Sequence, residues 1–356
     1  MMEVNSKLLI VSDIHLGSLD SERELFLQFL NNILNGEHGN NLQILIILGD
    51  FIDLCTDVTK TLLKRDKIQE ILNTLIEIKK KINLILVLGN HEIPVTGDYD
   101  EKFKRRKERF LKRFDRSDFK ELFEKEFCCH YLVLKKWNNE DMLLLYDDRN
   151  EIEANPNNQV RIQGLDLDND YTCLMTHGYQ FDGDLYRFFV GQIWKSLISS
   201  NNFEVKETYD YFWNYIIKNG RKIKPITYEM MKLELAKLKN KSLEFVDNLF
   251  IELSNLEFNL IKANMRVLKR WHHASKPDYY FDEIKAFLED ENYNLSKINH
   301  LIYGHSHHSG ISYGTINNQR VEIMNDGAWQ HVQPSYVEIL SKGMLKLRSF
   351  SDKPKS

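Results

Sequence analysis

An Asp-x-His triplet near the amino end and a His-x-His triplet near the carboxyl end carry the side chains best suited to bind a metal. Asp13 and His15 follow an apolar run, and His305 and His307 repeat the two-residue spacing. Carboxylate oxygens and imidazole nitrogens are ligands of transition metals. Because side chains two apart on a β-strand project to the same side, we expect each pair to face one ion. Taken alone, such a triplet is explained more simply as a solvated loop.

Three further polar clusters also come directly after apolar runs. Asp50 follows Gly49 and five apolar residues, where a carboxylate is costly to bury unless it is paired or coordinated. A helix N-cap or a turn is the alternative. Asn90 and His91 form the sequence GNHE with its neighbours, and there a turn former and a surface histidine are the alternatives. His177 precedes a glycine after another apolar run. Together the five clusters make coincidence implausible.

The apolar runs themselves predict the elements that position these residues. Three segments begin with uninterrupted apolar runs that are rich in β-branched side chains: residues 8–15, 44–53 and 84–92. Segments with a helical pattern, at 21–34 and 60–81, separate them. Such an alternation is typical of buried strands in an α/β sheet. Ligands of open α/β sheets bind at the carboxyl ends of the strands. The polar clusters therefore stand where a site is expected.

Further strands and a helical insertion are predicted in the rest of the chain. The expected strands are 131–137, 142–148, 171–178, 300–308 and 321–329, with a turn at Asn325, Asp326 and Gly327. Residues 221–303 contain no glycine, and leucines recur at helical spacing around 246–260. We therefore expect a core of residues 1–184 and 296–356, and a helical insertion or cap at 185–295.

Composition excludes several classes of protein. The 356 residues are 42% apolar and 28% charged, as in ordinary globular proteins, and the net charge of -4 gives no global argument for nucleic-acid or membrane binding. The four cysteines form no CxxC pair and no disulfide framework. No transmembrane segment and no signal peptide is predicted, so a cytoplasmic location is expected.

The motifs DIH, GDFID, GNHE, HG and GHSH stand in the order typical of one known family. In this respect the chain resembles the calcineurin-like metallophosphoesterase superfamily, over about residues 8–184 and 298–330. The resemblance implies a four-layer α/β/β/α sandwich and a hydrolase with two divalent metal ions. Manganese is the expected metal, with iron or zinc as alternatives, because imidazole suits transition metals.

The resemblance also implies a role for each motif residue. Asp13, His15 and His307 would bind one metal, Asn90, His177 and His305 the other, and Asp50 would bridge the two. A metal-bridging hydroxide would attack phosphorus in line, and the two cations would stabilise the developing charge. His91, adjacent to a ligand, is the expected catalytic residue, protonating the leaving oxygen or stabilising the transition state. Glu92 is equally consistent with orienting His91 or with simple exposure.

The expected substrate is a nucleotide or a lipid-linked small molecule, cleaved by a phosphodiesterase or pyrophosphatase. The run HGYQFD, followed at once by the insertion, resembles the UDP-2,3-diacylglucosamine pyrophosphatase branch. A nuclease or nucleic-acid phosphatase is the alternative, because residues 102–113 carry eight basic groups against one acid. A protein phosphatase and a non-catalytic scaffold rank lower. No pattern indicates the substrate-binding residues or the oligomeric state.

Several conspicuous residues have a simpler structural explanation. Asp53 is expected to be a structural partner, and Trp329 to pack in the core. Asp182 and Asp184 are as typical of turns as of substrate contacts. The remaining histidines are interpreted as ordinary surface or core residues, with His308 the nearest to the predicted metals.

Overall fold

The computed structural model describes the part of the chain that carries most of the predicted motifs. The described residues are 6–17, 21–52, 66–89, 119, 121–122, 127–146, 158–178, 298–316, 318–329 and 334–350. All of them belong to one of the chain's two units, which comprises Met1–Gly178 and Lys285–Ser356. The basic run at 102–113 and the predicted insertion at 185–295 lie outside the described residues. The division into core and cap therefore stays a prediction.

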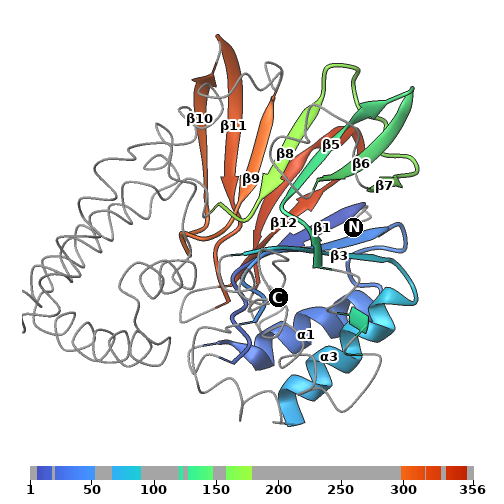
Figure 1. The fold of residues 1–356 in the computed structure, drawn as a ribbon, viewed down its shortest axis with the longest axis vertical. Coiled ribbons are helices and arrows are strands. Elements are labelled where there is room, and N and C mark those ends of the chain that lie inside the picture. The colour runs from blue at the N-terminus through green and yellow to red at the C-terminus, as the bar shows by residue number, and fades with distance from the viewer. Residues whose placement is uncertain are drawn as a thin grey trace, which may run out of the picture. The chain divides into compact units, whose positions relative to one another are not determined.

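The first sheet has six strands, and its centre is parallel. Its strands lie in the order β13 (Leu345–Ser349), β12 (Ser335–Ile339), β1 (Leu8–Val11), β2 (Ile44–Leu48), β3 (Asn83–Val87) and β4 (Phe127–Cys129). Strands β1 to β4 pair in parallel, whereas β12 is antiparallel to both of its neighbours. Helices α1 (Arg23–Leu34) and α3 (Asp66–Lys79) lie beside each other on one side of this sheet (Figure 1).

The second sheet has seven strands and mixes the two pairing directions. Its order is β10 (Gly310–Ile316), β11 (Gln319–Asn325), β9 (His300–Tyr303), β8 (Thr172–Thr176), β5 (Tyr131–Trp137), β6 (Glu140–Tyr146) and β7 (Asn158–Arg161). Strands β8, β9 and β11 run parallel to one another. A short 3-10 turn, Ser341–Gly343, connects β12 to β13 of the first sheet.

Two hydrophobic cores explain why strands β1 and β2 of the first sheet are apolar at every position. Leu9 and Val11 of β1 join the core formed with α1 and α3, while Leu8 and Ile10 join the core between the two sheets. Both faces of β1 are therefore covered, which removes any need for polar alternation. The predicted α/β class with buried parallel strands is confirmed. The described residues supply three layers, helices, sheet and sheet, so the fourth layer stays a prediction.

Helix α1 covers the first sheet through one apolar stripe. Phe26, Phe29 and Leu30 are buried at helical spacing and belong to the helix–sheet core. Trp329 packs against this stripe, with ring centroids 5.1 Å from Phe26 and 5.2 Å from Phe29, and its side chain is fully buried. The expectation that Trp329 is a core residue is confirmed. Its backbone carbonyl also accepts a hydrogen bond from Glu22 N–H, which ties the start of α1 to the segment after β11.

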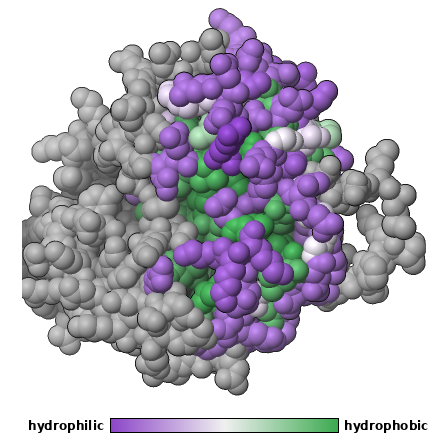
Figure 2. Space-filling model, turned by 90° about the vertical axis from the view of Figure 1, so that its right-hand side faces the viewer, coloured by the Kyte–Doolittle hydropathy of each residue, from purple (hydrophilic) through white to green (hydrophobic). Residues whose placement is uncertain are grey.

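The surface of the described part combines a hydrophilic exterior with a few exposed apolar side chains. Figure 2 shows one face, on which hydrophilic residues surround a central band of hydrophobic ones. The large exposed apolar residues are Ile311, Tyr313 and Met344. None of the helices in the described ranges has the length and apolarity needed to cross a bilayer. Cys129 and Cys173 are buried free thiols.

Candidate metal centre

The predicted site residues of the described part lie just beyond the carboxyl ends of parallel strands. Asp13 and His15 follow β1 and Asp50 follows β2 of the first sheet. In the second sheet, His177 follows β8, and His305 and His307 follow β9. Parallel strands gather their carboxyl ends at one edge, where α/β proteins bind ligands. Two sheets thus contribute to one polar region.

An unusual backbone conformation orients these side chains. The φ values of Asp13, His15, Asp50, His305 and His307 are 52°, 49°, 49°, 66° and 60°. Within the described ranges, ten non-glycine residues have a positive φ, and half of them are candidate ligands. The left-handed region is rarely occupied by residues other than glycine, and such residues collect at functional sites. The strands end earlier than predicted, at Val11 and Tyr303. The expected reason for the shared orientation, alternation along a strand, was therefore wrong: alternate left-handed residues beyond the strand produce it.

Backbone hydrogen bonds hold the two loops of the first sheet together. The N–H of Asp13 donates to Gly49 O at 3.1 Å, and the N–H of His15 donates to Asp50 O at 2.8 Å. In the second sheet, the N–H of Gly304 donates to His177 O at 2.9 Å. These hydrogen bonds continue the pairing of the strands into the loops. They fix the backbones that carry the ligand side chains relative to one another.

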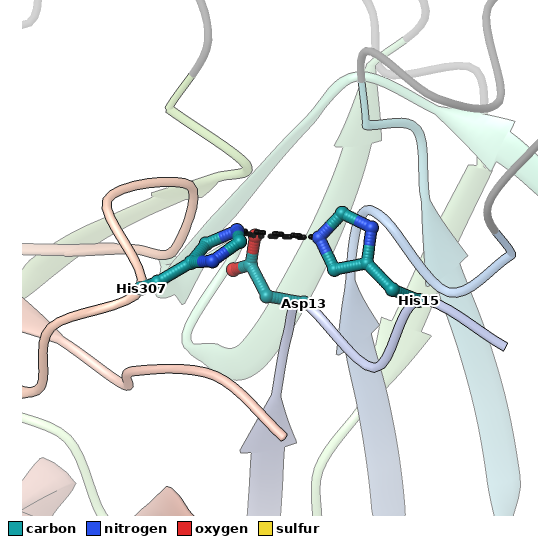
Figure 3. A group of neighbouring side chains, drawn as sticks. All are labelled: Asp13, His15 and His307. Carbon is teal, nitrogen blue, oxygen red and sulfur yellow. Dashed lines mark hydrogen bonds and ion pairs between the residues drawn. The ribbon is translucent and has the colours of Figure 1, made fainter. Parts of the chain in front are cut away.

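The first cluster consists of Asp13, His15 and His307. Figure 3 shows the two imidazoles on either side of the Asp13 carboxylate, each with a ring nitrogen turned toward it. Oδ1 of Asp13 lies 3.2 Å from Nε2 of His307 and 3.7 Å from Nε2 of His15, and the two Nε2 atoms are 3.2 Å apart. This Oδ1 atom is buried and accepts no hydrogen bond from the described residues. One oxygen and two nitrogens therefore converge on a single point.

The second cluster consists of Asp50, His177 and His305. One potential ligand atom from each lies within 4.8 Å of those of the other two. Nε2 of His177 is 3.2 Å from Oδ2 of Asp50, and the rings of His177 and His305 are 5.1 Å apart. The Nδ1 atom of His177 lies 2.9 Å from the carbonyl oxygen of Leu48. Because a carbonyl can only accept, Nδ1 carries the hydrogen in the neutral ring and Nε2 keeps its lone pair for a ligand.

The spacing of these atoms suits metal coordination. Two ligands about 2.1 Å from one ion are about 3.0 to 3.4 Å apart at tetrahedral or octahedral angles. The 3.2 Å separations in the first cluster fall in that range, and the third, 3.7 Å, is slightly longer. Nitrogen and oxygen donors without thiolate favour manganese, iron or zinc over calcium. The residues of the first cluster therefore fit a divalent metal ion, and those of the second supply donors of the same types.

The electrostatics of the metal-free protein show a strong coupling between carboxylates and imidazoles. Burial opposes ionisation of Asp13, but His177, His15 and His307 outweigh it and hold the pKa of the Asp13 carboxyl well below its usual range. Burial likewise disfavours protonated His177, but the carboxylates of Asp50 and Asp13 raise its pKa to about 9. Buried negative charge thus attracts a proton to His177 in the absence of a metal cation.

Residues that sequence reasoning did not assign to the site form its outer shell. Asn325, interpreted as part of a turn, is fully buried, and its Nδ2 donates to Gly304 O at 2.7 Å and to Ser306 Oγ at 3.0 Å. Ser12 donates to Oδ2 of Asp13, which also accepts the N–H of His305 at 2.8 Å. The only signal for these groups is their position beside a motif, since Ser12 precedes DIH and Asn325 begins NDG.

Glycines clear the space that the ligand side chains need. A Cβ atom on Gly304 would collide with Oγ of Ser12 and Oδ2 of Asp13. A Cβ on Gly89 would similarly collide with the side chain of Asp50. The GNHE sequence begins at Gly89, but Asn90, His91 and Glu92 lie outside the described residues, as do Asp53, Asp182 and Asp184. Six of the seven predicted ligands are thus described, and they form two clusters.

Comparison with family models places the chain in one family. The family model for calcineurin-like phosphoesterases matches residues 6–188, just over half of the chain. Among solved structures, a nuclease of Pseudomonas putida is 27% identical over 28% of this chain and 45% of the nuclease, with a TM-score of 0.20. The match thus spans less than half of that nuclease.

Two other solved structures align over most of the chain at low identity. A dimetal phosphatase from Danio rerio is 11% identical over 97% of this chain and 98% of that one, with a TM-score of 0.35. A cold-active protein-tyrosine phosphatase of a psychrophilic Shewanella species is 13% identical over 98% and 81%, with a TM-score of 0.33. At these scores none of the three assigns a substrate. The comparison with curated proteins gives no match.

Proposed function

This chain belongs to the calcineurin-like phosphoesterase family. We propose that it is a metal-dependent phosphoester hydrolase and that its two clusters bind the two metal ions of a phosphodiesterase or pyrophosphatase. Asp13, His15 and His307 would hold the first ion. His177 and His305 would hold the second, together with Asn90, which lies outside the described residues. Two such cations supply Lewis-acid activation of water and stabilisation of the charge that develops on phosphorus.

The position of Asp50 is the observation that carries this proposal. Its Oδ2 atom lies 3.6 Å from Nε2 of His15 in the first cluster and 3.2 Å from Nε2 of His177 in the second. One buried carboxylate oxygen is therefore shared by ligands of both clusters. A bridging carboxylate requires this placement, and an N-cap or turn aspartate does not. We assign Asp50 as the bridge.

His91 is the proposed catalytic residue. It is adjacent to the proposed ligand Asn90 and comes two residues after Gly89, whose Cα faces the side chain of Asp50 closely enough to exclude a Cβ. An imidazole at this place in the chain can donate a proton to the leaving oxygen or a hydrogen bond to a phosphoryl oxygen in the transition state. Such groups contribute about 10²- to 10⁴-fold to rate.

The proposed substrate is a nucleotide or lipid-linked small molecule, with a nuclease as the second candidate. The first choice follows from the predicted cap at 185–295, directly after the HGYQFD run. The second follows from the basic run at 102–113, which would attract polymeric phosphate. Manganese is the proposed metal because the donors are imidazole and carboxylate.

A substrate screen combined with metal analysis of the same sample tests these proposals. The Mn²⁺-loaded protein is offered nucleotide sugars, dinucleotides, cyclic nucleotides and single-stranded DNA, with Asp50→Asn as the inactive control. Turnover of small diphosphates with about two metals per chain would support the pyrophosphatase assignment. Cleavage restricted to DNA would instead favour the nuclease. A wild type that holds two metals yet cleaves none of them would refute both.

A further inference from the structure

A second buried carboxyl group is connected to Asp13 through the hydroxyl group of Ser12. Asp326 follows β11 and is fully buried. Its Oδ1 atom is 2.7 Å from Oγ of Ser12. The same Oγ donates to Oδ2 of Asp13 in a short contact and lies 3.1 Å from the carbonyl oxygen of Gly327. Ser12 therefore stands between two carboxyl groups.

The number of hydrogens in this network is too small if both carboxyl groups are ionised. Ser12 has a single hydroxyl hydrogen, and three oxygen acceptors surround its Oγ. Only one of them can receive that hydrogen. Asp13 has imidazole partners for a negative charge, so the hydroxyl hydrogen is assigned to its Oδ2 atom. The 2.7 Å contact between Ser12 Oγ and Asp326 Oδ1 is then a hydrogen bond only if a second hydrogen lies on Asp326. Two bare oxygens at that distance would instead repel each other.

The surroundings of Asp326 favour its neutral form. Its Oδ2 atom is buried and receives no hydrogen bond from the described residues, a condition that is very costly for an anion. No Lys or Arg of the described ranges forms an ion pair with it. Burial and the nearby charge of Asp13 raise the pKa of Asp326 well above its usual range. Asp13, by contrast, has imidazole partners for its charge.

We propose that Asp326 is a positioning residue held as a neutral carboxylic acid, which donates its hydrogen to Ser12 and thereby directs the Ser12 hydroxyl onto Oδ2 of Asp13. Oδ2 then has two donors, Ser12 and the N–H of His305, and Oδ1 is left for the metal ion. A neutral Asp326 also keeps the charge of the first cluster at that of a single carboxylate. This inference rests on the proposed role of Asp13 as a metal ligand.

Substitutions can separate the donor function of Asp326 from its charge. Asp326→Asn keeps the shape and an N–H donor and is expected to bind Mn²⁺ like the wild type. Asp326→Ala and Ser12→Ala remove the relay, and each should weaken Mn²⁺ binding about 10- to 100-fold, as loss of an outer-shell partner usually does. Because Asp326 acts through Ser12, the variant that carries both alanine substitutions should bind Mn²⁺ as tightly as Ser12→Ala alone.

Matched controls come from the same chain. Ser312→Ala removes a buried hydroxyl that makes no hydrogen bond in the described part and lies on β10. Asp166→Asn removes an exposed carboxylate at a left-handed position that asparagine tolerates. Both should bind Mn²⁺ like the wild type. Titration calorimetry and thermal unfolding of the metal-free forms distinguish lost affinity from lost folding.

An infrared difference spectrum between the metal-free wild type and Asp326→Asn tests the protonation state without any activity. We expect the wild type to show the carbonyl stretch of a protonated carboxylic acid that Asp326→Asn lacks. A carboxylate signature in its place would overturn the proposal, and so would Asp326→Asn with as large a loss of Mn²⁺ affinity as Asp326→Ala. Unchanged affinity in Ser12→Ala would also overturn it. If the wild type bound no metal, the proposed function would fail, while the spectrum would still decide the state of Asp326.

Discussion

The Nε2 atoms of His15 and His307 lie 3.2 Å apart although the residues are 292 positions apart in the chain. His15 comes from the loop after β1 and His307 from the loop after β9, so the contact joins the first sheet to the second. Oδ1 of Asp13 lies within 3.7 Å of both nitrogens. Such an arrangement suits these three donors to the coordination of one cation.

Loss of the bridging charge should be more damaging than loss of an outer-shell group. Asp50→Asn replaces a carboxylate oxygen near both clusters by a neutral amide. We expect metal content to fall and activity to decrease by more than the about 10- to 100-fold typical of outer-shell changes. Elemental analysis and initial rates on one preparation measure both. Full metal occupancy and full activity in this variant would contradict the bridging assignment.

His91→Ala should separate catalysis from metal binding. If His91 transfers a proton or stabilises the transition state, kcat should fall about 10²- to 10⁴-fold while the metal content stays that of the wild type. Steady-state kinetics and elemental analysis give the two values, and His300→Ala, which alters a histidine paired with Glu322 instead, serves as the control. An equal loss of metal in His91→Ala and Asp50→Asn would show that His91 is a ligand.

Gly304→Ala should disrupt the first cluster selectively. The added methyl group would overlap Ser12 Oγ and Asp13 Oδ2, and no flexible surface chain is available to yield. We expect weaker metal binding together with lower thermal stability. Gly164→Ala is the comparison, because its φ of +62° makes alanine strained but its nearest neighbour, Lys7 Nζ, is 3.5 Å away. That variant should lose stability and keep its metals, and metal loss in both would point to a general effect.

Asn325→Asp tests whether the loop carrying His305 and His307 is held by an amide. The substitution keeps an oxygen that accepts the N–H of Gly327 but removes the donors to Gly304 O and Ser306 Oγ. Gly304 O keeps the N–H of Ser306 as a donor, but in the variant it faces a buried carboxylate oxygen instead of an amide donor. This loss should cost about 1 to 3 kcal/mol of unfolding free energy and should lower metal affinity. Chemical denaturation and calorimetry measure the two effects. Unchanged metal affinity would show that the loop keeps its position without the amide.

Metal-free and metal-loaded protein should differ in their dependence on pH. The folded pKa of His177 is raised to about 9 from an ordinary 6.5 by Asp50 and Asp13 against the opposing effect of burial. Protonated His177 with its carboxylate partners therefore stabilises the fold. This contribution is fully present below about pH 6.5 and is lost as the pH rises through about 9. The Tm of the metal-free protein should therefore fall over that interval.

Metal binding should reverse this trend and release protons. An ion in the second cluster requires neutral His177, so its affinity should rise with pH up to about 9. Calorimetry at pH 7.5 in buffers of different ionisation enthalpy counts the protons that are released. Absence of proton release would show that His177 is already neutral before the metal binds.

The sequence was sufficient for the parts of the fold that depend on hydrophobic patterning. Strand 131–137 was predicted with the bounds that the structure has, because both of its ends are marked by polar residues. Strand β13 was not predicted, since LKLRS is a short edge strand with a partly exposed face. Strand β4 has three residues, which is too few for any periodicity to be visible. Short edge strands are defined by their partners rather than by their own residues.

The candidate site was predictable to the level of its ligand types. Six of the predicted ligand residues lie in two clusters in the described part, and each follows an apolar strand whose end is recognisable. The left-handed backbone at Asp13 and His305 could not be predicted, as neither residue type requires it. Nor could Ser12 and Asp326, 314 positions apart, be connected from sequence. Their contact arises from tertiary packing alone.

Each of the two clusters takes side chains from both sheets. Asp13 and His15 of the first sheet meet His307 of the second, and Asp50 of the first meets His177 and His305 of the second. An ion in either cluster would therefore act as a cross-link between two layers that otherwise adhere through a non-directional apolar core. The metals would then hold the two sheets together at the edge that carries the ligands, in addition to their role in chemistry. One sheet could not move relative to the other at this edge without releasing both ions.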